Sequence, residues 1–297
     1  MNQFSPSEAA LEGFRLVRRH PGAILAWCGV YFLGIVAIAL VMAAVLGPTF
    51  IAFIGEREIQ PADYDRFAGE LIQYWPSIIA VLMLALYFIA VITNAMFRTM
   101  QVRGPMPRAG IRFGGDEIRV AIVHSVLSFL FLCILASMGW LMAAAFQLNG
   151  VMALVSMGLV ALFVWLFVRL GLALPATLAE GRVAFAKGWR LSRGRFWSLL
   201  GMWTLAIIFY FMTWLLITVV NGGFVALAAF AQSKATGTAL GVLVVAVAIV
   251  AMLIQMFSSV LQIVIPLAPT GVAYEALGGP EDEIPAVPPA GAEPTPA

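Results

Sequence analysis

The sequence predicts an all-α polytopic membrane protein with six transmembrane helices and cytoplasmic in-plane amphipathic helices. Two observations lead to this fold class. Hydrophobic residues make up 62% of the 297 residues and charged residues only 11%, which is too few charges to cover a soluble protein of this length. Long apolar blocks also recur along the chain, and Lys and Arg residues gather in every second connection between them.

Each apolar block is long enough for a transmembrane helix. About 20 apolar residues are needed to cross the ~30 Å hydrocarbon core of a bilayer. We therefore expect a single six-helix domain over residues 1–277, followed by a disordered Pro-rich tail over 278–297 that has no apolar periodicity. The expected spans are 22–46, 76–97, 118–146, 151–174, 196–220 and 236–268.

The positive charge predicts the orientation of the spans. Residues 1–21, 98–119 and 175–195 contain thirteen of the seventeen Lys and Arg residues. Connections rich in Lys and Arg face the cytoplasm, so we expect a bacterial inner-membrane protein with both termini cytoplasmic. Because the basic residues lie beside the spans, we expect membrane lipids as partners and no nucleic acid; protein partners are not indicated.

Glycine and proline residues predict where helices end. The Gly-Pro sequence at 47–48 is expected to close the first span, and the Asn-Gly-Gly sequence at 221–223 is expected to break the fifth apolar block. Pro266 and Pro269 are expected to kink or end the sixth block. A short helix over 61–75 is expected on the outer face of the membrane.

An amphipathic helix is expected at the N-terminus, starting at a Ser5 or Ser7 cap. Leu11, Phe14 and Val17 have the spacing of one apolar face. Such a helix would lie in the inner headgroup region with its basic residues in water.

Two basic segments that precede expected spans are similar in sequence. Residues 13–18 read Gly-Phe-Arg-Leu-Val-Arg and residues 188–193 read Gly-Trp-Arg-Leu-Ser-Arg, with four of six positions identical. Their shared position favours a repeated unit, in which a basic in-plane helix leads into a membrane hairpin; coincidence is the alternative. The candidate headgroup-binding residues in and beside these segments are Arg15, Arg18, Arg19, Arg190, Arg193 and Arg195.

The sequence contains no recognisable catalytic, phosphate-binding or metal-binding motif, and no acidic residue lies at the middle of an expected span. Cys28 and Cys133 are too few and too separated for a disulfide framework or a zinc site. We therefore expect a protein that is not an enzyme and has no cofactor or metal. His124 is a candidate proton-relay residue, with a contact to headgroups or a carbonyl as the alternative.

The sixth apolar block carries a polar face. Gln255, Ser259 and Gln262 follow an i, i+4, i+7 spacing, so they either line a path for a substrate or form interhelical hydrogen bonds. Arg169, near the end of the fourth block, is expected to reach the cytoplasmic surface. If it faces the helix bundle, the available partners are Glu180 and Glu117.

The segment before the fifth span combines several distinctive features. The fourth block ends in Leu174-Pro175, Glu180 follows, and the pattern Trp-x-Leu-x-x-Gly at 189–194 leads to an aromatic start of the next span. This combination resembles the bacterial family named for the membrane domain of glycerophosphoryl diester phosphodiesterase. The family resemblance extends over the six-span plan of the chain.

The end of the sixth block is similar to the closing segment of that family. Pro266-Leu267 is followed by Tyr274, although residues 275–278 stand where the family usually has an arginine. The catalytic barrel of the named enzyme does not fit in this chain, and its His-Arg-containing motif is absent. The resemblance therefore implies a stand-alone membrane domain.

These observations favour a non-enzymatic integral membrane protein that binds lipid or supports partner proteins in the envelope. A transporter or permease for a neutral or lipid-like solute is the alternative, favoured by the six spans and the polar face of the last one. A membrane-embedded lipid enzyme is a further alternative, and it lacks a catalytic constellation in the sequence.

Overall fold

The regular structure is helical throughout the part of the chain that the structure describes. This computed structural model describes residues 5–55, 69, 74–101, 107–147, 149–234 and 238–278. Six helices within these residues are long and apolar enough to cross a membrane, which confirms the all-α polytopic membrane fold. In chain order the elements are α1 (Pro6–Ala10), α2 (Glu12–Arg19), α3 (Pro21–Gly55), α5 (Trp75–Gln101), η1 (Pro107–Gly110), α6 (Gly115–Phe146), α7 (Gly150–Leu170), α8 (Ala173–Glu180), α9 (Phe185–Leu191), α10 (Phe196–Lys234) and α11 (Thr238–Ala276).

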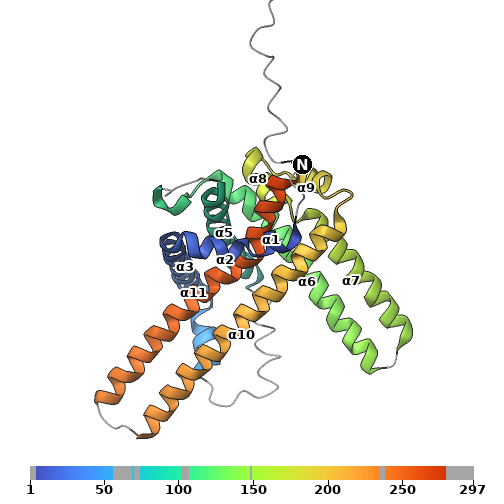
Figure 1. The fold of residues 1–297 in the computed structure, drawn as a ribbon. Helices are drawn as coiled ribbons and strands as arrows, with labels where there is room; N and C mark the ends of the chain where they lie inside the picture. Colours follow the sequence, from blue (N-terminus) through green and yellow to red (C-terminus); the bar gives the residue numbers. More distant parts are fainter. Residues whose placement is uncertain are drawn as a thin grey trace, which may run out of the picture.

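The long helices in these residues pair as three hairpins, α3–α5, α6–α7 and α10–α11. A short helical element precedes each hairpin: α2, η1 and α9, respectively. The hairpins α6–α7 and α10–α11 lie close together beside α1 and diverge toward their turns (Figure 1). We call the end of the molecule that contains α1, α2, η1, α8 and α9 the basic end, because the described arginines of the short elements lie there.

The short helix α2 packs mainly against the last hairpin, not against its own. Gly13 on α2 is so close to α11 that an added Cβ would lie 2.8 Å from the Ile265 Cα atom. Gly188 on α9 is equally close to α8, where an added Cβ would lie 2.7 Å from the Ala173 nitrogen. In both similar segments, 13–18 and 188–193, the first residue is therefore a glycine that allows two helices to pack closely. Helix α2 thus adds to the direct contacts that α11 makes with α3 and α5 of the first hairpin.

Two of the predicted helix ends are wrong. Helix α3 continues through residues 47–48 to Gly55, and α10 continues through 221–223 to Lys234, so the expected break in the fifth block does not occur. In hydrocarbon, each backbone polar group needs a partner within its own segment, and this favours a continuous helix even where glycine or proline would start a turn in water.

Helix α11 does not end at its prolines. It continues past Pro266 and Pro269 to Ala276, where neighbouring elements at the basic end pack against it. Prolines are tolerated in membrane helices when neighbouring helices and local adjustments satisfy the freed backbone groups. The expected helix over 61–75 lies almost entirely outside the described residues, as does the tail beyond Gly278.

The N-terminal amphipathic segment forms two short helices, with a turn at Leu11 and Ser5 as the N-cap of α1. Leu11 and Phe14 are 38% and 39% exposed. Val17 of the predicted apolar face packs against the main core, and the Phe14 ring packs edge to face against Phe209 on α10 with its centroid 5.6 Å away. Small side chains allow the segment to approach α10 and α11 closely, so it packs on the last hairpin. Its buried residues are Ala9, Ala10, Gly13 and Leu16.

The main core lies near the basic end and joins α3, α5, α6, α8 and α11. Trp27 and Phe97 are among its largest buried side chains. By contrast, only 11% of the residues are buried in the most apolar stretches of the spans formed by α7 with α8 and by α10. Acyl chains are as apolar as these exposed side chains and cover them in a bilayer.

Candidate functional site

The predicted polar face of α11 makes contacts with α10 and within α11. Asn221 Nδ2 on α10 donates a hydrogen bond to Gln255 Oε1 (3.2 Å), and the Tyr210 hydroxyl lies 3.5 Å from Gln262 Oε1. Ser259 donates to the Gln255 backbone carbonyl (2.9 Å). None of these side chains lines the cleft described below.

The predicted headgroup-binding arginines lie at the basic end, on and beside the two short helices α2 and α9. Arg15 and Arg19 each lie 3.5 Å from the carboxylate of Glu12. The other four arginines are exposed and take part in no ion pair between described residues: Arg18, Arg190, Arg193 and Arg195. Of the six arginines, Arg19 lines the cleft and the rest do not.

An open cleft of about 1110 Å³ lies at the basic end, between the start of α3, the end of α5 and the segment that joins η1 to α6. Arg19, His20 and Arg112 supply its cationic and titratable groups, and Phe113, which is 58% exposed, lies beside Arg112. No acidic side chain is among the described residues that line it. The complete lining is Arg19, His20, Pro21, Gly22, Ala23, Ala26, Thr99, Ala109, Ile111, Arg112 and Phe113.

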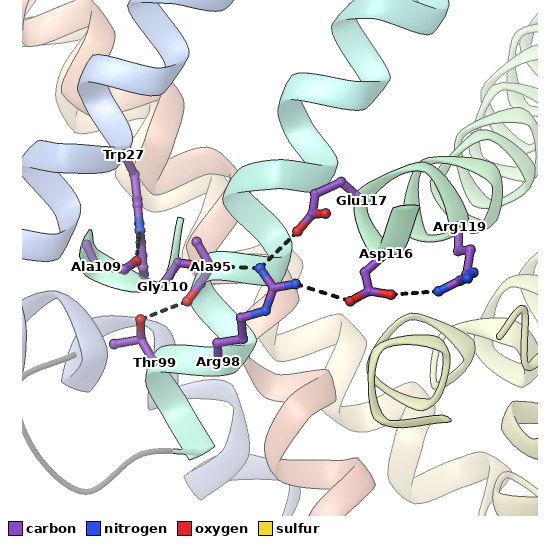
Figure 2. A network of polar contacts seen from close by, with 9 residues as sticks. All are labelled: Trp27, Ala95, Arg98, Thr99, Ala109, Gly110, Asp116, Glu117 and Arg119. Atoms are coloured by element: carbon purple, nitrogen blue, oxygen red, sulfur yellow. Dashed lines mark hydrogen bonds and ion pairs between the residues drawn. The ribbon is translucent and has the colours of Figure 1, made fainter. Parts of the chain in front are cut away.

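Two buried side chains hold the backbone that forms one wall of this cleft. Trp27 Nε1 donates a hydrogen bond to the Ala109 carbonyl (2.9 Å), and Arg98 Nη1 donates one to the Gly110 carbonyl (3.3 Å), as Figure 2 shows. Ala109 and Gly110 have φ angles of 49° and 72°. The left-handed conformation costs an alanine about 1–2 kcal/mol, and the two hydrogen bonds offset that cost.

Arg98 also forms a buried ion pair between α5 and α6. Its Nη1 atom lies 2.9 Å from Glu117 Oε1, and its Nη2 atom lies 3.7 Å from Asp116 Oδ2. Asp116 in turn lies 2.6 Å from Arg119 Nη1 on the more exposed side (Figure 2). The two carboxylates occupy the first turn of α6, where the helix dipole also favours negative charge. This network fixes the end of α5 against the start of α6.

Further polar groups lie deeper than this ion pair. Asn94, one turn before Arg98 on α5, is fully buried, and neither of its side-chain polar atoms has a hydrogen-bond partner among the described residues. His124, two turns after Glu117 on α6, has a buried Nδ1 atom that likewise has no such partner. Because α5 and α6 are packed neighbours, the polar groups extend from the cleft wall toward the membrane interior.

A second charged cluster joins α8, α9 and α11. Lys187 Nζ lies 3.1 Å from Glu180 and 5.8 Å from the ring centre of Tyr274, and Arg182 Nε lies 2.9 Å from Glu180. Glu180 and Tyr274, two residues that carry the family resemblance, therefore both contact Lys187. The two carboxylates named as alternative partners of Arg169 are paired with other cations, Glu117 with Arg98 and Glu180 with Lys187.

The described residues favour anion binding over metal binding. They contain no group of three or more His, Cys, Asp or Glu side chains that could hold a metal ion. Cys28 and Cys133 are free thiols. The cleft offers guanidinium groups, which form charge-assisted hydrogen bonds to phosphate and carboxylate oxygens.

No protein-family model matches the chain, and neither a curated protein nor a solved structure is significantly similar to it. The fold defines a multi-pass membrane protein. The resemblance to the membrane domain of glycerophosphoryl diester phosphodiesterase stays a prediction.

Sequence reasoning missed three residues of the site: Trp27, Arg98 and Arg112. The sequence places Arg98 and Arg112 in one basic segment, but it gives no sign that Arg98 turns inward to Glu117 while Arg112 lines the cleft. Trp27 reads as an ordinary apolar residue of a span, and its single hydrogen bond to Ala109 depends on contacts between distant parts of the chain.

Proposed function

We propose that the protein is a non-enzymatic multi-pass protein of the bacterial inner membrane that binds anionic phospholipid headgroups at its cytoplasmic basic end. The cleft with Arg19 and Arg112 carries this proposal. It combines cationic side chains, no acidic lining residue among those described, and the exposed apolar ring of Phe113. A phosphate near the arginines and acyl chains along the apolar surface would both find suitable partners.

The charge balance of the cleft supports an anionic ligand. Arg112 is exposed and has no ion-pair partner among the described residues, and Arg19 has only the 3.5 Å contact to Glu12. Asp116 and Glu117, which follow the cleft-lining residues 111–113 in the chain, are paired with Arg98 and Arg119. Juxtamembrane arginines contribute roughly 1 kcal/mol each toward an anionic membrane surface.

Lipid binding is favoured over transport because the polar residues of α11 make contacts with a neighbouring helix. Gln255 and Gln262 contact α10, through Asn221 and Tyr210. The resemblance to the membrane domain of the glycerophosphoryl diester phosphodiesterase family is compatible with the same role, because the catalytic site of that enzyme lies in a soluble barrel and not in its membrane domain.

Lipid titration in neutral detergent tests the proposal. The purified protein is titrated with dioleoyl phosphatidylglycerol or dioleoyl phosphatidylcholine, and bound lipids are counted by native mass spectrometry. The double variant Arg19→Gln/Arg112→Gln is expected to bind phosphatidylglycerol roughly 30-fold more weakly, from about 2 kcal/mol of lost attraction. The matched control is Arg190→Gln/Arg193→Gln, which removes the same charge from the end of α9 and the turn that follows it. Equal affinity of the cleft variant and the wild type would refute the proposal.

A further inference from the structure

Arg169, near the end of α7, lies against two tryptophan rings that also contact each other. Its guanidinium carbon is 5.4 Å from the ring centre of Trp165, also on α7, and 5.4 Å from that of Trp189 on α9. The two rings meet edge to face with their centroids 5.2 Å apart. The cation therefore bridges a transmembrane helix and an in-plane helix through its attraction to both rings.

No carboxylate balances this cation among the described residues. Glu117 is paired with Arg98, and Glu180 is paired with Lys187. The Nε atom of Arg169 is buried and has no hydrogen-bond acceptor in the described protein. Indole rings attract a cation but offer no acceptor lone pair to its N–H groups, so the donor edge of the guanidinium is left without a partner.

The position of Arg169 indicates which anion supplies that partner. The residue is the last but one of α7, at the basic end, and tryptophans are enriched where membrane helices meet the headgroup layer. A guanidinium presents its donors as a planar fork that matches the oxygens of a phosphate group. The rings of Trp165 and Trp189 restrict the fork in advance, which lowers the entropy lost when an anion binds.

We propose that Arg169 is a phosphate-binding residue, with Trp165 and Trp189 holding its guanidinium in position. The phosphate comes either from a phospholipid at the basic end or from inorganic phosphate in solution. This site is separate from the cleft, because none of the three residues lines the cleft. The proposal for Arg169 can therefore be tested independently of the proposed function.

The experiment uses delipidated full-length protein in neutral detergent, in the Arg19→Gln/Arg112→Gln background, so that the cleft does not contribute. Three probes are titrated: dioleoyl phosphatidylglycerol, dioleoylglycerol, which lacks phosphate, and inorganic phosphate. Native mass spectrometry counts the bound lipid. Intrinsic fluorescence, to which all eight tryptophans contribute, is compared between this background and the same protein with Arg169→Gln, so that the difference reports on the rings beside Arg169. A protein that retains phosphatidylglycerol but not dioleoylglycerol supports the lipid source, and displacement of that lipid by inorganic phosphate supports the free-anion source.

Adding Arg169→Gln to this background is expected to weaken binding of the phosphate probe at least tenfold, as for loss of a charge-assisted hydrogen bond. The control is Arg182→Gln, which removes one exposed arginine that contacts Glu180 and is expected to bind as its parent does. If Arg169→Gln does not yield monodisperse protein, Arg169→Lys retains the charge but loses the fork, and severalfold weaker binding is expected. Binding unchanged by either substitution overturns the proposal.

Discussion

Arg98 Nη1 lies 2.9 Å from Glu117 Oε1, in a pair whose side chains are only 10% and 2% exposed. The same Arg98 atom donates a hydrogen bond to the Gly110 carbonyl. One guanidinium thus joins α5 to α6 and also holds the wall of the cleft. Stability and the shape of the candidate site are therefore coupled through a single residue.

Substitution of Glu117 by Leu is expected to destabilise the protein by about 3–5 kcal/mol, because Arg98 would remain as a buried charge with only the distant Asp116 as partner. The double variant Arg98→Met/Glu117→Leu is expected to recover most of this loss, since an apolar pair of similar volume carries no desolvation penalty. Unfolding of the detergent-solubilised protein by dodecyl sulfate measures both. A double variant as unstable as the sum of the two single variants would contradict the expectation.

Replacing Trp27 by Phe is expected to weaken binding of phosphatidylglycerol about fivefold, because the hydrogen bond to the Ala109 carbonyl is worth about 1 kcal/mol and fixes the cleft wall. The same lipid titration by native mass spectrometry checks this. Trp140, 60% exposed on α6, provides the control substitution Trp140→Phe, which is expected to leave affinity unchanged. Equal affinities for the two variants would rule out a role for Trp27 in positioning the wall.

Gly13→Ala and Gly188→Ala are each expected to destabilise the protein by about 1–3 kcal/mol. The added methyl group would lie 2.8 Å and 2.7 Å, respectively, from backbone atoms that cannot move alone, so whole helices must shift. Gly201 on α10 has no atom within 4 Å of an added Cβ, so Gly201→Ala is expected to stabilise by about 0.5–1 kcal/mol. Unfolding in dodecyl sulfate measures the stability of all three variants. If Gly201→Ala is destabilised and Gly13→Ala is unaffected, the interpretation of Gly13 as a close helix contact is wrong.

The proposed orientation is checked with reporter fusions. Alkaline phosphatase fused at Asp65 is expected to be active, because the connection after the first span has few basic residues and should face the periplasm. The same reporter fused at Gly188, in the basic segment that contains α9, is expected to be inactive. The opposite pair of activities would reverse the orientation and move the cleft to the other membrane face.

The sequence predicted the fold class well because apolar length and charge asymmetry are local properties. It predicted helix ends less well, since the Asn-Gly-Gly sequence at 221–223 favours a turn in water but not in hydrocarbon. The residues of the candidate site could be predicted even less well than the helix ends. Arg18 and Arg98 look alike in a sequence, yet one is exposed and the other is buried beside Glu117. That difference depends on contacts between α5, η1 and α6, and helix periodicity does not specify such contacts.

The amphipathic pattern at the N-terminus predicted the packing of this segment only in part. Phe14 packs edge to face against Phe209 on α10. The closest approach to the last hairpin, however, is made by Gly13 and the neighbouring alanines. Close approach between helices rewards small side chains, and a pattern based on hydrophobicity gives these little weight.

The contact between Gly13 and Ile265 also sets the order in which parts of the protein can pack during synthesis. Synthesis proceeds from the N-terminus, so α2 leaves the ribosome long before α11 exists. Helix α2 can adopt its final packing only after α11 has been made and inserted. A nascent protein stopped before Ile265 would therefore present α2 with its packing face uncovered.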